Sequence, residues 1–381
     1  MNIAIIGSGL TGSLAAISLA KAGCRVDLYE RLSDEELVNR DRTYAITHSS
    51  RKILEKLGVW SNLSKDLVPF QYLNVIDYEL NKKFEFLVND LTFPNQKYSA
   101  VGWIAEHKFI MLSILSFISN LENINKISTS VIPNTNNYDL IVAADGSSSN
   151  TKKKLNTPSF HFKYDQMCIT AKVLLRGVKS NEAFEILNSE GPFAVLPLGG
   201  DLFQIICSQS ILKGTYNMNL SKSLFLDYLS TILPYGIEPD TIIDEPESFP
   251  IDFCLNYLLF SGKYIYVGET AHKVHPVGGQ GLNLCWRDVD CLANLCTIPL
   301  LKNNVSLIPL TYSISRLFDI LSISFLTDIL VRYSRSNISI FYFPRLLVFF
   351  ILKKSSLFRK YILNLLTNGF YFELYINDKF E

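Results

Sequence analysis

The sequence predicts an α/β (α+β) protein in which a Rossmann-like nucleotide-binding domain is interleaved with an antiparallel β-sheet domain and followed by C-terminal helices. Two observations carry most of this prediction. The chain opens with an apolar strand, a glycine-rich turn and an alanine-rich helix, and residues 160–260 alternate apolar and polar positions as sheet strands do. The tail over 317–381 is rich in apolar residues and is expected to be helical.

Chain length suggests the number of domains. At 381 residues the chain is long enough for about two domains. No low-complexity linker separates them, so we expect the domains to interleave. The nucleotide-binding domain is expected over 1–60, 101–158 and 261–316, the β-sheet substrate domain over 61–100 and 159–260, and a helical region over 317–381.

The first element is a buried strand over Ile3–Ile6, which leads directly into the sequence GSGLTG. Gly7 permits the tight turn that ends the strand, and Gly9 lets the backbone approach a pyrophosphate. Gly12 lets the following helix pack closely against the strand. A GxGxxG pattern alone is weak evidence, but its place between a strand and a helix predicts a dinucleotide site.

The next two elements complete a βαβ unit. A helix over about Leu10–Lys21 points its N-terminus, with free N–H groups and a partial positive charge, toward the phosphates. The second strand ends at Glu30, whose carboxylate can accept hydrogen bonds from ribose hydroxyls. An ordinary βαβ unit without a nucleotide is the competing interpretation, and the terminal acid argues against it.

Further elements follow from apolar periodicity and from the residues that end each run. The expected elements are helices over Ser50–Leu57 and Glu106–Ser119, a buried strand over Leu140–Ala144 that ends in Asp145-Gly146, and sheet strands over 170–175 and 202–208.

A second glycine-rich segment lies in the last part of the predicted nucleotide-binding domain. The strand Tyr264–Val267 ends in Gly268-Glu269, and a loop with one proline and three glycines then leads into a helix that carries Leu284–Leu295. Such a loop exposes backbone N–H groups and can form a nest for an anion or oxyanion. A plain strand–loop–helix connection is the alternative, but it needs far less glycine.

Composition excludes several classes of protein. Lys plus Arg and Asp plus Glu both number 36, so the net charge of zero argues against a nucleic-acid-binding protein that relies on a global positive field. The seven cysteines show neither a CxxC pair nor metal-ligand spacing with histidine, so we expect reduced cysteines and no metal site. The first residues already form a strand and lack a signal peptide, which predicts a cytoplasmic protein.

These motifs together resemble the FAD-dependent aromatic hydroxylases of the para-hydroxybenzoate hydroxylase fold, and most closely the ubiquinone-biosynthesis hydroxylase family. The resemblance spans nearly the whole chain, and five motifs stand in the family's order. The motifs are Gly7–Gly12 with Glu30, the arginine-containing segment 41–46 with the helix over 53–60, Asp145-Gly146, the segment GPFAVLPL over 191–198, and Gly268–Asn283.

The resemblance implies a role for each matching residue. The first glycines and Glu30 would hold the ADP half of FAD, Arg42 would contact the cofactor, and Glu269 would bond its ribityl chain. Asp145 and Gly146 would lie along the pyrophosphate, and the second glycine loop would cradle the isoalloxazine edge. The implied cofactor-binding residues are Gly7, Gly9, Gly12, Glu30, Arg42, Asp145, Gly146, Gly268, Glu269, Pro276, Gly278, Gly279, Gln280, Gly281, Leu282 and Asn283.

Two features depart from the family pattern. The family usually has aspartate at the position of Glu269, and the extra methylene must be absorbed by a small shift of the loop or sugar. The segment 121–139 is shorter than the hairpin that relatives place there. Both departures motivate a non-catalytic assembly protein of the same fold as one alternative function.

The implied reaction is hydroxylation of an aromatic ring, such as a prenylated phenol or other quinone precursor, with O2 and with NADPH or NADH as a transient reductant. No catalytic residue follows from the sequence; His272 and His275 are weak candidates, because a histidine among apolar residues is more often structural. Another flavoprotein of this fold, such as a prenyl reductase, is the second alternative.

The tail also bears on partners. Its apolar residues over 317–369 are interspersed with Lys and Arg, which is compatible with peripheral contact at the inner membrane face. The most apolar run, Leu346–Leu352, is far shorter than the roughly 20 residues that span a bilayer. Helices packed on the nucleotide-binding domain are the favoured interpretation. A quinone-biosynthesis complex and a homo-oligomer both stay open as assemblies.

Overall fold

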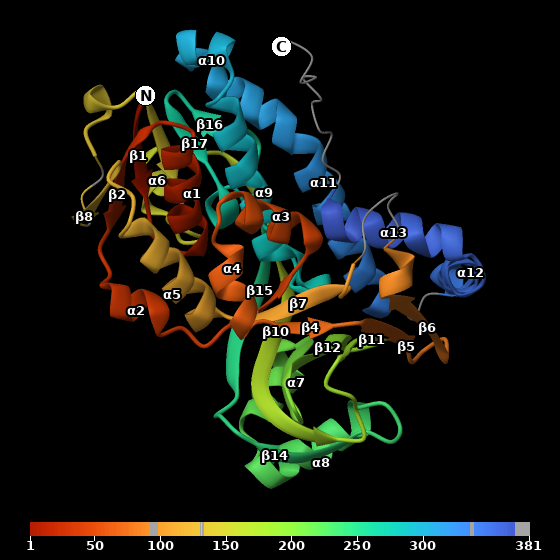
Figure 1. Cartoon of the computed structure of the whole chain (residues 1–381). Coiled ribbons are helices and arrows are strands. Elements are labelled where there is room, and N and C mark those ends of the chain that lie inside the picture. Colours follow the sequence, from red (N-terminus) through yellow and green to blue (C-terminus); the bar gives the residue numbers. More distant parts are fainter. Residues whose placement is uncertain (92–97, 130, 132, 336–338, 370–381) are drawn as a thin grey trace.

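The computed structural model describes residues 1–91, 98–129, 131, 133–335 and 339–369. It confirms the mixed α/β architecture: a Rossmann-like region with a parallel sheet lies above a larger, mainly antiparallel sheet, and the C-terminal helices lie to one side (Figure 1). The first sheet has the strand order β16-β17-β9-β1-β2-β8. Its strands are β1 (Asn2–Ile6), β2 (Arg25–Glu30), β8 (Ile124–Ser128), β9 (Leu140–Ala143), β16 (Phe260–Ser261) and β17 (Tyr264–Tyr266).

Helices cover this parallel sheet because its strands are apolar on both faces. Leu14, Ile17 and Trp286 are completely buried between α1, α9 and the sheet, and this burial supplies the main apolar contact of the region. The helices of this region are α1 (Leu10–Lys21), α2 (Asp34–Val38), α3 (His48–Lys56), α4 (Trp60–Leu63), α5 (His107–Ile118), α6 (Asn150–Lys154), α9 (Gln280–Leu295) and α10 (Pro299–Asn303).

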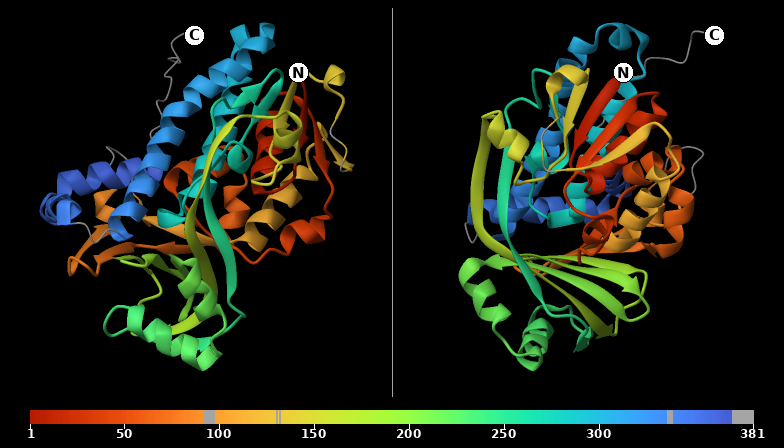
Figure 2. Two further views of the ribbon diagram at one scale, coloured as in Figure 1. Left: turned by 180° about the vertical axis from the view of Figure 1, so that it is seen from behind. Right: turned by 90° about the vertical axis from the view of Figure 1, so that its left-hand side faces the viewer.

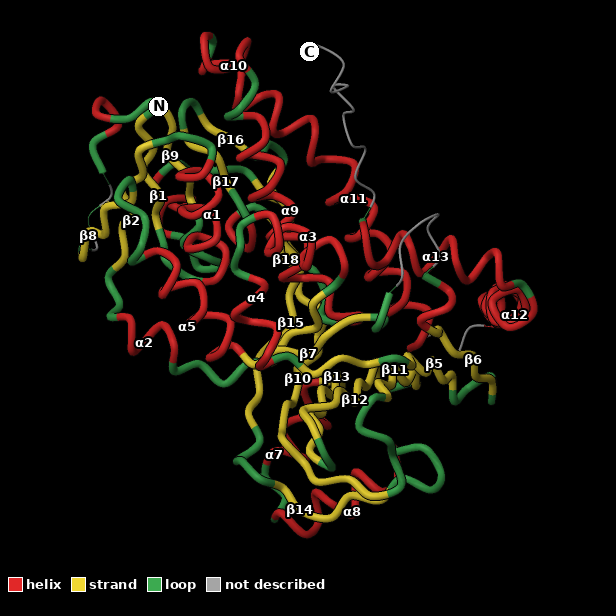
Figure 3. Tube along the Cα trace, in the orientation of Figure 1, coloured by secondary structure: helices red, strands yellow, loops and turns green. Residues whose placement is uncertain are grey.

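The larger sheet has the strand order β18-β15-β10-β13-β12-β11-β5-β6, and β14 pairs with β10. Helices α7 (Ile211–Met218) and α8 (Lys222–Ile232) lie at its outer side, away from the Rossmann-like region (Figures 1 and 3). Its strands are β5 (Tyr72–Asp77), β6 (Lys82–Leu87), β10 (Ser159–Arg176), β11 (Glu182–Asn188), β12 (Gly191–Gly199), β13 (Leu202–Ser210), β14 (Glu238–Ile242), β15 (Glu247–Asn256) and β18 (His272–Lys273).

Three features join the two regions. The long strands β10 and β15 run from one region into the other (Figure 2). Strand β18 belongs to the predicted nucleotide-binding segment 261–316, yet it pairs with β15 of the larger sheet. A small sheet between them consists of β3 (Thr43–Ile46), β7 (Gly102–Glu106) and β4 (Val68–Phe70), in the order β3-β7-β4.

The C-terminal helices pack on both regions. Helix α11 (Ile308–Arg335) lies against α9, whereas α12 (Ser339–Lys354) and α13 (Ser356–Asn368) reach the edge of the larger sheet at β6 and the turn after it (Figure 1). The expectation that the whole tail packs on the nucleotide-binding domain is met by α11, and by α13 where it contacts α3, whereas α12 packs on the larger sheet at β6. Over the described residues, the helices fall short of the length and apolarity needed to cross a membrane.

Two tail arginines explain this placement. Arg345 is 7% exposed and forms an ion pair with the buried Asp77 at the end of β5. Arg359 Nε lies 3.2 Å from Asp90 Oδ2. The sequence pattern treats both as surface cations of the tail, but each one anchors a helix to the larger sheet or the turn next to it.

The predicted elements agree closely with the structure, with small shifts at their ends. The helix expected over 50–57 starts two residues earlier, at His48, directly after Thr47, whose N–H donates a 3.0 Å hydrogen bond to Asn283 Oδ1. The strands expected over 170–175 and 202–208 are parts of the longer β10 and β13.

Candidate functional site

All three predicted nucleotide motifs lie at the carboxyl edge of the parallel sheet. Strands β1, β2, β9 and β17 are parallel neighbours in register. Glu30 is the last residue of β2, and Gly7, Asp145 and Gly268 follow the ends of β1, β9 and β17 within two residues. After β1, the chain adds β2 on one side of β1 and later adds β9 on the other side. The motifs therefore meet at a topological switch point, where open α/β sheets bind their ligands.

The first glycine loop is packed as its pattern requires. A Cβ at Gly12 would come within 1.8 Å of the Gly7 carbonyl oxygen, so only glycine lets α1 approach the end of β1 this closely. A Cβ at Gly7, whose φ is +96°, would lie 2.5 Å from the Ala144 carbonyl oxygen. Gly9, by contrast, faces open space, and no side chain caps the α1 N-terminus. This end of α1 keeps N–H groups available for an anion.

Glu30 is tied directly to that loop. Its Oε2 accepts a 2.7 Å hydrogen bond from the Ser8 N–H, and Oε1 accepts bonds of 2.8 Å and 3.1 Å from the N–H groups of Arg31 and Leu32. These bonds hold the carboxylate beside the glycine loop. The binding of a ribose by Glu30 stays a prediction.

The second motif contacts the third. The Gly146 N–H donates a 3.0 Å hydrogen bond to Thr270 Oγ1, which joins the end of β9 to the loop after β17. The Asp145 carboxylate points to the residues that follow it, where it accepts hydrogen bonds from Ser149 Oγ at 2.6 Å and from the Thr151 N–H at 3.0 Å. Gly268 packs against the first motif, because a Cβ there would meet Thr11 at 2.9 Å.

The second glycine loop has a backbone that favours glycine. Gly278 and Gly279 are consecutive left-handed residues with φ of +68° and +61°. Gly278 and Gly281 face open space, whereas a Cβ at Gly279 would meet Ala45 at 2.9 Å. The Gly279 N–H donates a 3.0 Å bond to the Pro276 carbonyl, and α9 then begins at Gln280 without a side-chain cap.

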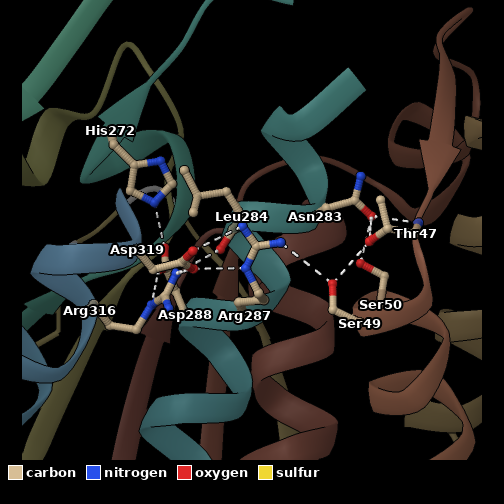
Figure 4. Close-up of polar contacts among 10 residues, drawn as sticks. All are labelled: Thr47, Ser49, Ser50, His272, Asn283, Leu284, Arg287, Asp288, Arg316 and Asp319. Carbon is tan, nitrogen blue, oxygen red and sulfur yellow. Dashed lines mark hydrogen bonds and ion pairs between the residues drawn. The ribbon is translucent and has the colours of Figure 1, made fainter. Parts of the chain in front are cut away.

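Asn283 locks this loop against the small sheet (Figure 4). Its Nδ2 donates to the carbonyls of Ala45 at 2.8 Å and Gly279 at 2.9 Å. Its Oδ1 accepts bonds from Thr47 and from Ser50 Oγ, the latter at 2.7 Å. The side chain therefore has its hydrogen bonds within the protein, and Leu282 beside it packs against the core.

Arg42 and Glu269 come together at Tyr44. Both are exposed side chains, and Arg42 lies over the Phe249 ring at 5.9 Å. Burial raises the pKa of the Tyr44 phenol to about 12, and the charges of Arg42 and Glu269 act on it in opposite directions. Neither Tyr44 nor Thr270 is predicted as a site residue from the sequence. For Tyr44, the available signal is its position inside the arginine-containing segment.

The two histidines lie behind the glycine loop. His272 Nε2 lies 2.6 Å from Asp288 Oδ2, and its side chain is 1% exposed. The His275 ring stands edge-on to Tyr164 at 5.1 Å, and its Nδ1 accepts a 3.2 Å bond from the Val277 N–H. These contacts hold both rings within the protein. A catalytic role for either histidine stays a prediction.

Asp288 belongs to a buried charge network that joins α9 to α11 (Figure 4). Its Oδ2 also accepts a 3.0 Å bond from the Gly268 N–H, and its Oδ1 accepts a 2.7 Å bond from Arg316 Nε. Burial opposes ionisation of Asp288, but His272 and Arg316 outweigh it and hold its pKa below the ordinary value. Arg316 and Arg287 share Asp319 at 2.9 Å and 2.8 Å.

The residues at this edge fit a flavin dinucleotide. Three glycines, Gly9, Gly278 and Gly281, face open space at the ends of two helices whose N–H groups lack side-chain caps. Gln280 Oε1 is buried and lacks a hydrogen-bond partner among the described residues. Backbone donors at two helix N-termini suit a pyrophosphate and the polar edge of a flavin ring.

A separate pocket lies on the other side of the larger sheet. It has a volume of about 260 Å³ and is lined by residues of β13, α7 and α8, among them Cys207, Lys213 and Tyr228. It contains none of the motif residues. We therefore place the candidate site at the motifs.

Comparisons with known proteins agree with this geometry. Residues 5–34 match the family model of the NAD(P)-binding Rossmann-like domain. The chain is 28% identical to the uncharacterized protein slr1300 of Synechocystis sp. over 313 residues, which covers 77% of this chain and 74% of that protein. It is 24% identical to the ubiquinone biosynthesis monooxygenase COQ6 of Dictyostelium discoideum, over 77% of this chain and 76% of the relative.

A third relative is the 3-demethoxyubiquinol 3-hydroxylase of Escherichia coli, with 23% identity over 77% of this chain and 79% of the relative. The resemblance to the ubiquinone-biosynthesis hydroxylases is confirmed. The hydroxylase fold extends to solved structures: p-nitrophenol 4-monooxygenase PnpA from Pseudomonas putida has a TM-score of 0.77 at 17% identity, over 96% of this chain and 98% of that chain. HpxO of Klebsiella pneumoniae, complexed with FAD and uric acid, has a TM-score of 0.73 at 14% identity, over 97% of both chains.

Proposed function

We propose that this chain is an FAD-dependent monooxygenase that hydroxylates an aromatic ring, with NADPH or NADH as reductant. The observation that carries the proposal is the meeting of all three motifs at one edge of the parallel sheet. The ubiquinone hydroxylases among the relatives support a prenylated phenol or a related quinone precursor as substrate. When bound, FAD would supply the redox chemistry that activates O2.

The chain's own residues would bind and orient the cofactor. The α1 N-terminus and Gly9 would receive the pyrophosphate, and Glu30 would bind the ribose. Gly278 and Gly281 would leave room for the flavin ring, which α9 would contact through free N–H groups. Asn283 would contribute to cofactor binding by holding the second glycine loop in place.

A spectroscopic experiment tests this function. The purified chain is titrated with FAD, followed by NADPH or NADH without oxygen, and hydroxylated product is then sought with a prenylated phenol and ¹⁸O2. We expect flavin absorption that bleaches with one of the reductants, and one labelled oxygen in the product. A protein that stays colourless at saturating FAD would refute the enzyme and favour the assembly role. Reduction of a prenyl chain without O2 would favour the reductase.

Peripheral membrane contact is part of the same proposal, because a polyprenylated substrate resides in the bilayer. The C-terminal helices carry several exposed apolar side chains, such as Phe325 at 68%, Phe350 at 59% and Leu357 at 77% exposure. Lys353 and Lys354 end α12 beside them. Apolar side chains next to cations favour an anionic lipid surface.

A further inference from the structure

Strand β11 carries a carboxylate at an unexpected place. Glu185 lies on the face of the larger sheet that includes Ala183 and Leu187, which are 0% and 6% exposed. Phe184 and Ile186 point to the opposite face and join the core under α8. A carboxylate between two buried apolar neighbours is costly unless it has a function or a partner.

The cross-strand neighbours of Glu185 are apolar and only half-buried. Ala194 of β12 and Val75 of β5 lie directly opposite it in register. Ile206 and Phe84 continue the row on either side. These five residues form a half-buried strip across the sheet, in which Glu185 is the polar member.

The strip faces the second glycine loop. Ile206 packs in one cluster with Val277, and the Gly278 backbone amide lies close enough to the Glu185 carboxylate to lower its pKa. Gly278 is one of the glycines that face open space at the candidate flavin site. Glu185 is thus the acid through which the substrate sheet contacts the cofactor loop.

The environment also sets the protonation of this acid. Burial raises the pKa of Glu185 to about 7, and the Gly278 amide opposes this shift. No ion pair of Glu185 occurs among the described residues, and no charged side chain there contributes to the shift. A carboxylate with a pKa near neutrality is suited to accept a proton from a bound ligand.

We propose that Glu185 is the base that accepts the phenol proton of the substrate. The phenol O–H bond breaks, a carboxyl O–H bond forms on Glu185, and the substrate stays in the site as a phenolate. Negative charge on the phenol oxygen makes the ring electron-rich, which aromatic hydroxylation requires. This inference rests on the proposed function.

The test uses 4-nitrophenol as a probe, because its phenolate absorbs visible light and its phenol does not. Difference spectra of the FAD-loaded wild type and of Glu185→Gln are recorded with the probe near pH 7 in weak buffer, and the protons released on binding are counted with a pH indicator. We expect the wild type to release little proton per bound phenolate, because Glu185 takes it up. Glu185→Gln should release about one proton more per bound phenolate, since glutamine takes up no proton and is neutral like a protonated carboxyl.

Two variants sharpen the result. Glu182→Gln, on the same strand but paired with Lys179 at 3.3 Å, should behave as the wild type. Glu185→Asp keeps a titratable group and should restore part of the effect. Equal proton release per bound phenolate in Glu185→Gln and in the wild type would overturn the proposal. So would loss of FAD absorption in both Glu185 variants, because Glu185 would then only support the loop.

The outcome is separable from that of the proposed function. A wild type that binds FAD and the probe phenolate but yields no ¹⁸O-labelled product from any phenol would refute hydroxylation. The proton release measured with the probe would still report whether Glu185 takes the proton.

Discussion

Two glycines of the site differ in the space around them. A Cβ at Gly12 would strike the protein backbone at 1.8 Å, whereas a Cβ at Gly281 meets no protein atom within 4 Å. We expect Gly12→Ala to lower the melting temperature of the FAD-free protein. Gly281→Ala should leave it unchanged or raise it, since alanine favours a helix by about 1 kcal/mol.

FAD affinity distinguishes the two variants further. Gly281→Ala should weaken FAD binding about tenfold or more, or about 1.4 kcal/mol, because the added methyl group occupies cofactor space. Flavin fluorescence titration and thermal unfolding measure the two effects. Wild-type FAD affinity in Gly281→Ala would show that this glycine faces solvent and not the cofactor.

His48 makes stability depend on pH. Its Nε2 donates a 3.0 Å bond to the Ala100 carbonyl, and burial lowers its pKa to about 4. The unfolded chain takes up the proton near pH 6.5 while the folded protein does not, so stability is full above pH 6.5 and falls toward pH 4. The loss between pH 7 and pH 5 should be about 2 kcal/mol from this residue.

Urea unfolding at the two pH values tests this expectation. His48→Gln keeps a donor without a titrating ring, so the loss between pH 7 and pH 5 should become smaller by that amount. His161→Gln removes an exposed histidine, whose side chain is 48% exposed, and should leave the wild-type loss in place. An equal pH dependence in His48→Gln and wild type would contradict the assignment.

At the scale of elements, the buried network decides how α11 is held. Asp288, Arg316 and Asp319 are at most 1% exposed, so removing one partner leaves a buried charge without compensation. We expect Asp319→Ala to destabilise the fold by about 3–5 kcal/mol in urea unfolding. The exposed pair Arg332–Asp328 on the same helix is the control, and Arg332→Ala should cost at most about 1 kcal/mol.

The network also shows what the sequence could and could not predict. Helix α1 and the motif residues of β1, β2 and β17 follow from glycine spacing and apolar periodicity, which are local properties. The partners of Asp288 come from β18, from the end of β17 and from α11, so their approach depends on tertiary packing. The same holds for Arg345, whose partner Asp77 lies far away in the sequence.

Glu185 illustrates the limit inside the site itself. Strand patterning predicts sheet over this region, but it gives no sign that one acid of β11 faces the loop at Gly278. The pairing of β11 with β12 places Glu185 opposite Ala194 of the GPFAVLPL segment, and this register cannot be read from either segment by itself. A single acid within a run that is apolar on both faces of the strand is the signal available.

At the scale of the whole molecule, the tail helices predict lipid binding. We expect co-flotation with vesicles that contain anionic lipid, and weaker flotation after Phe350→Ser combined with Leu357→Ser. Leu212→Ser is the matched control, since Leu212 is 87% exposed on α7, away from the tail. Flotation of the double variant at the wild-type level, with unchanged folding, would exclude this surface.

The interleaved sheets have a consequence for synthesis of the chain. Leu14 shares its buried core with Trp286 of α9, and the glycine loop needs Gly268 and Asp288 to complete its surroundings. At roughly 5–20 residues per second, a ribosome releases these partners about a quarter of a minute to a minute after the first strand. The nascent N-terminal half therefore waits with its apolar helix exposed, and chaperone occupancy should concentrate there until residue 286 has emerged.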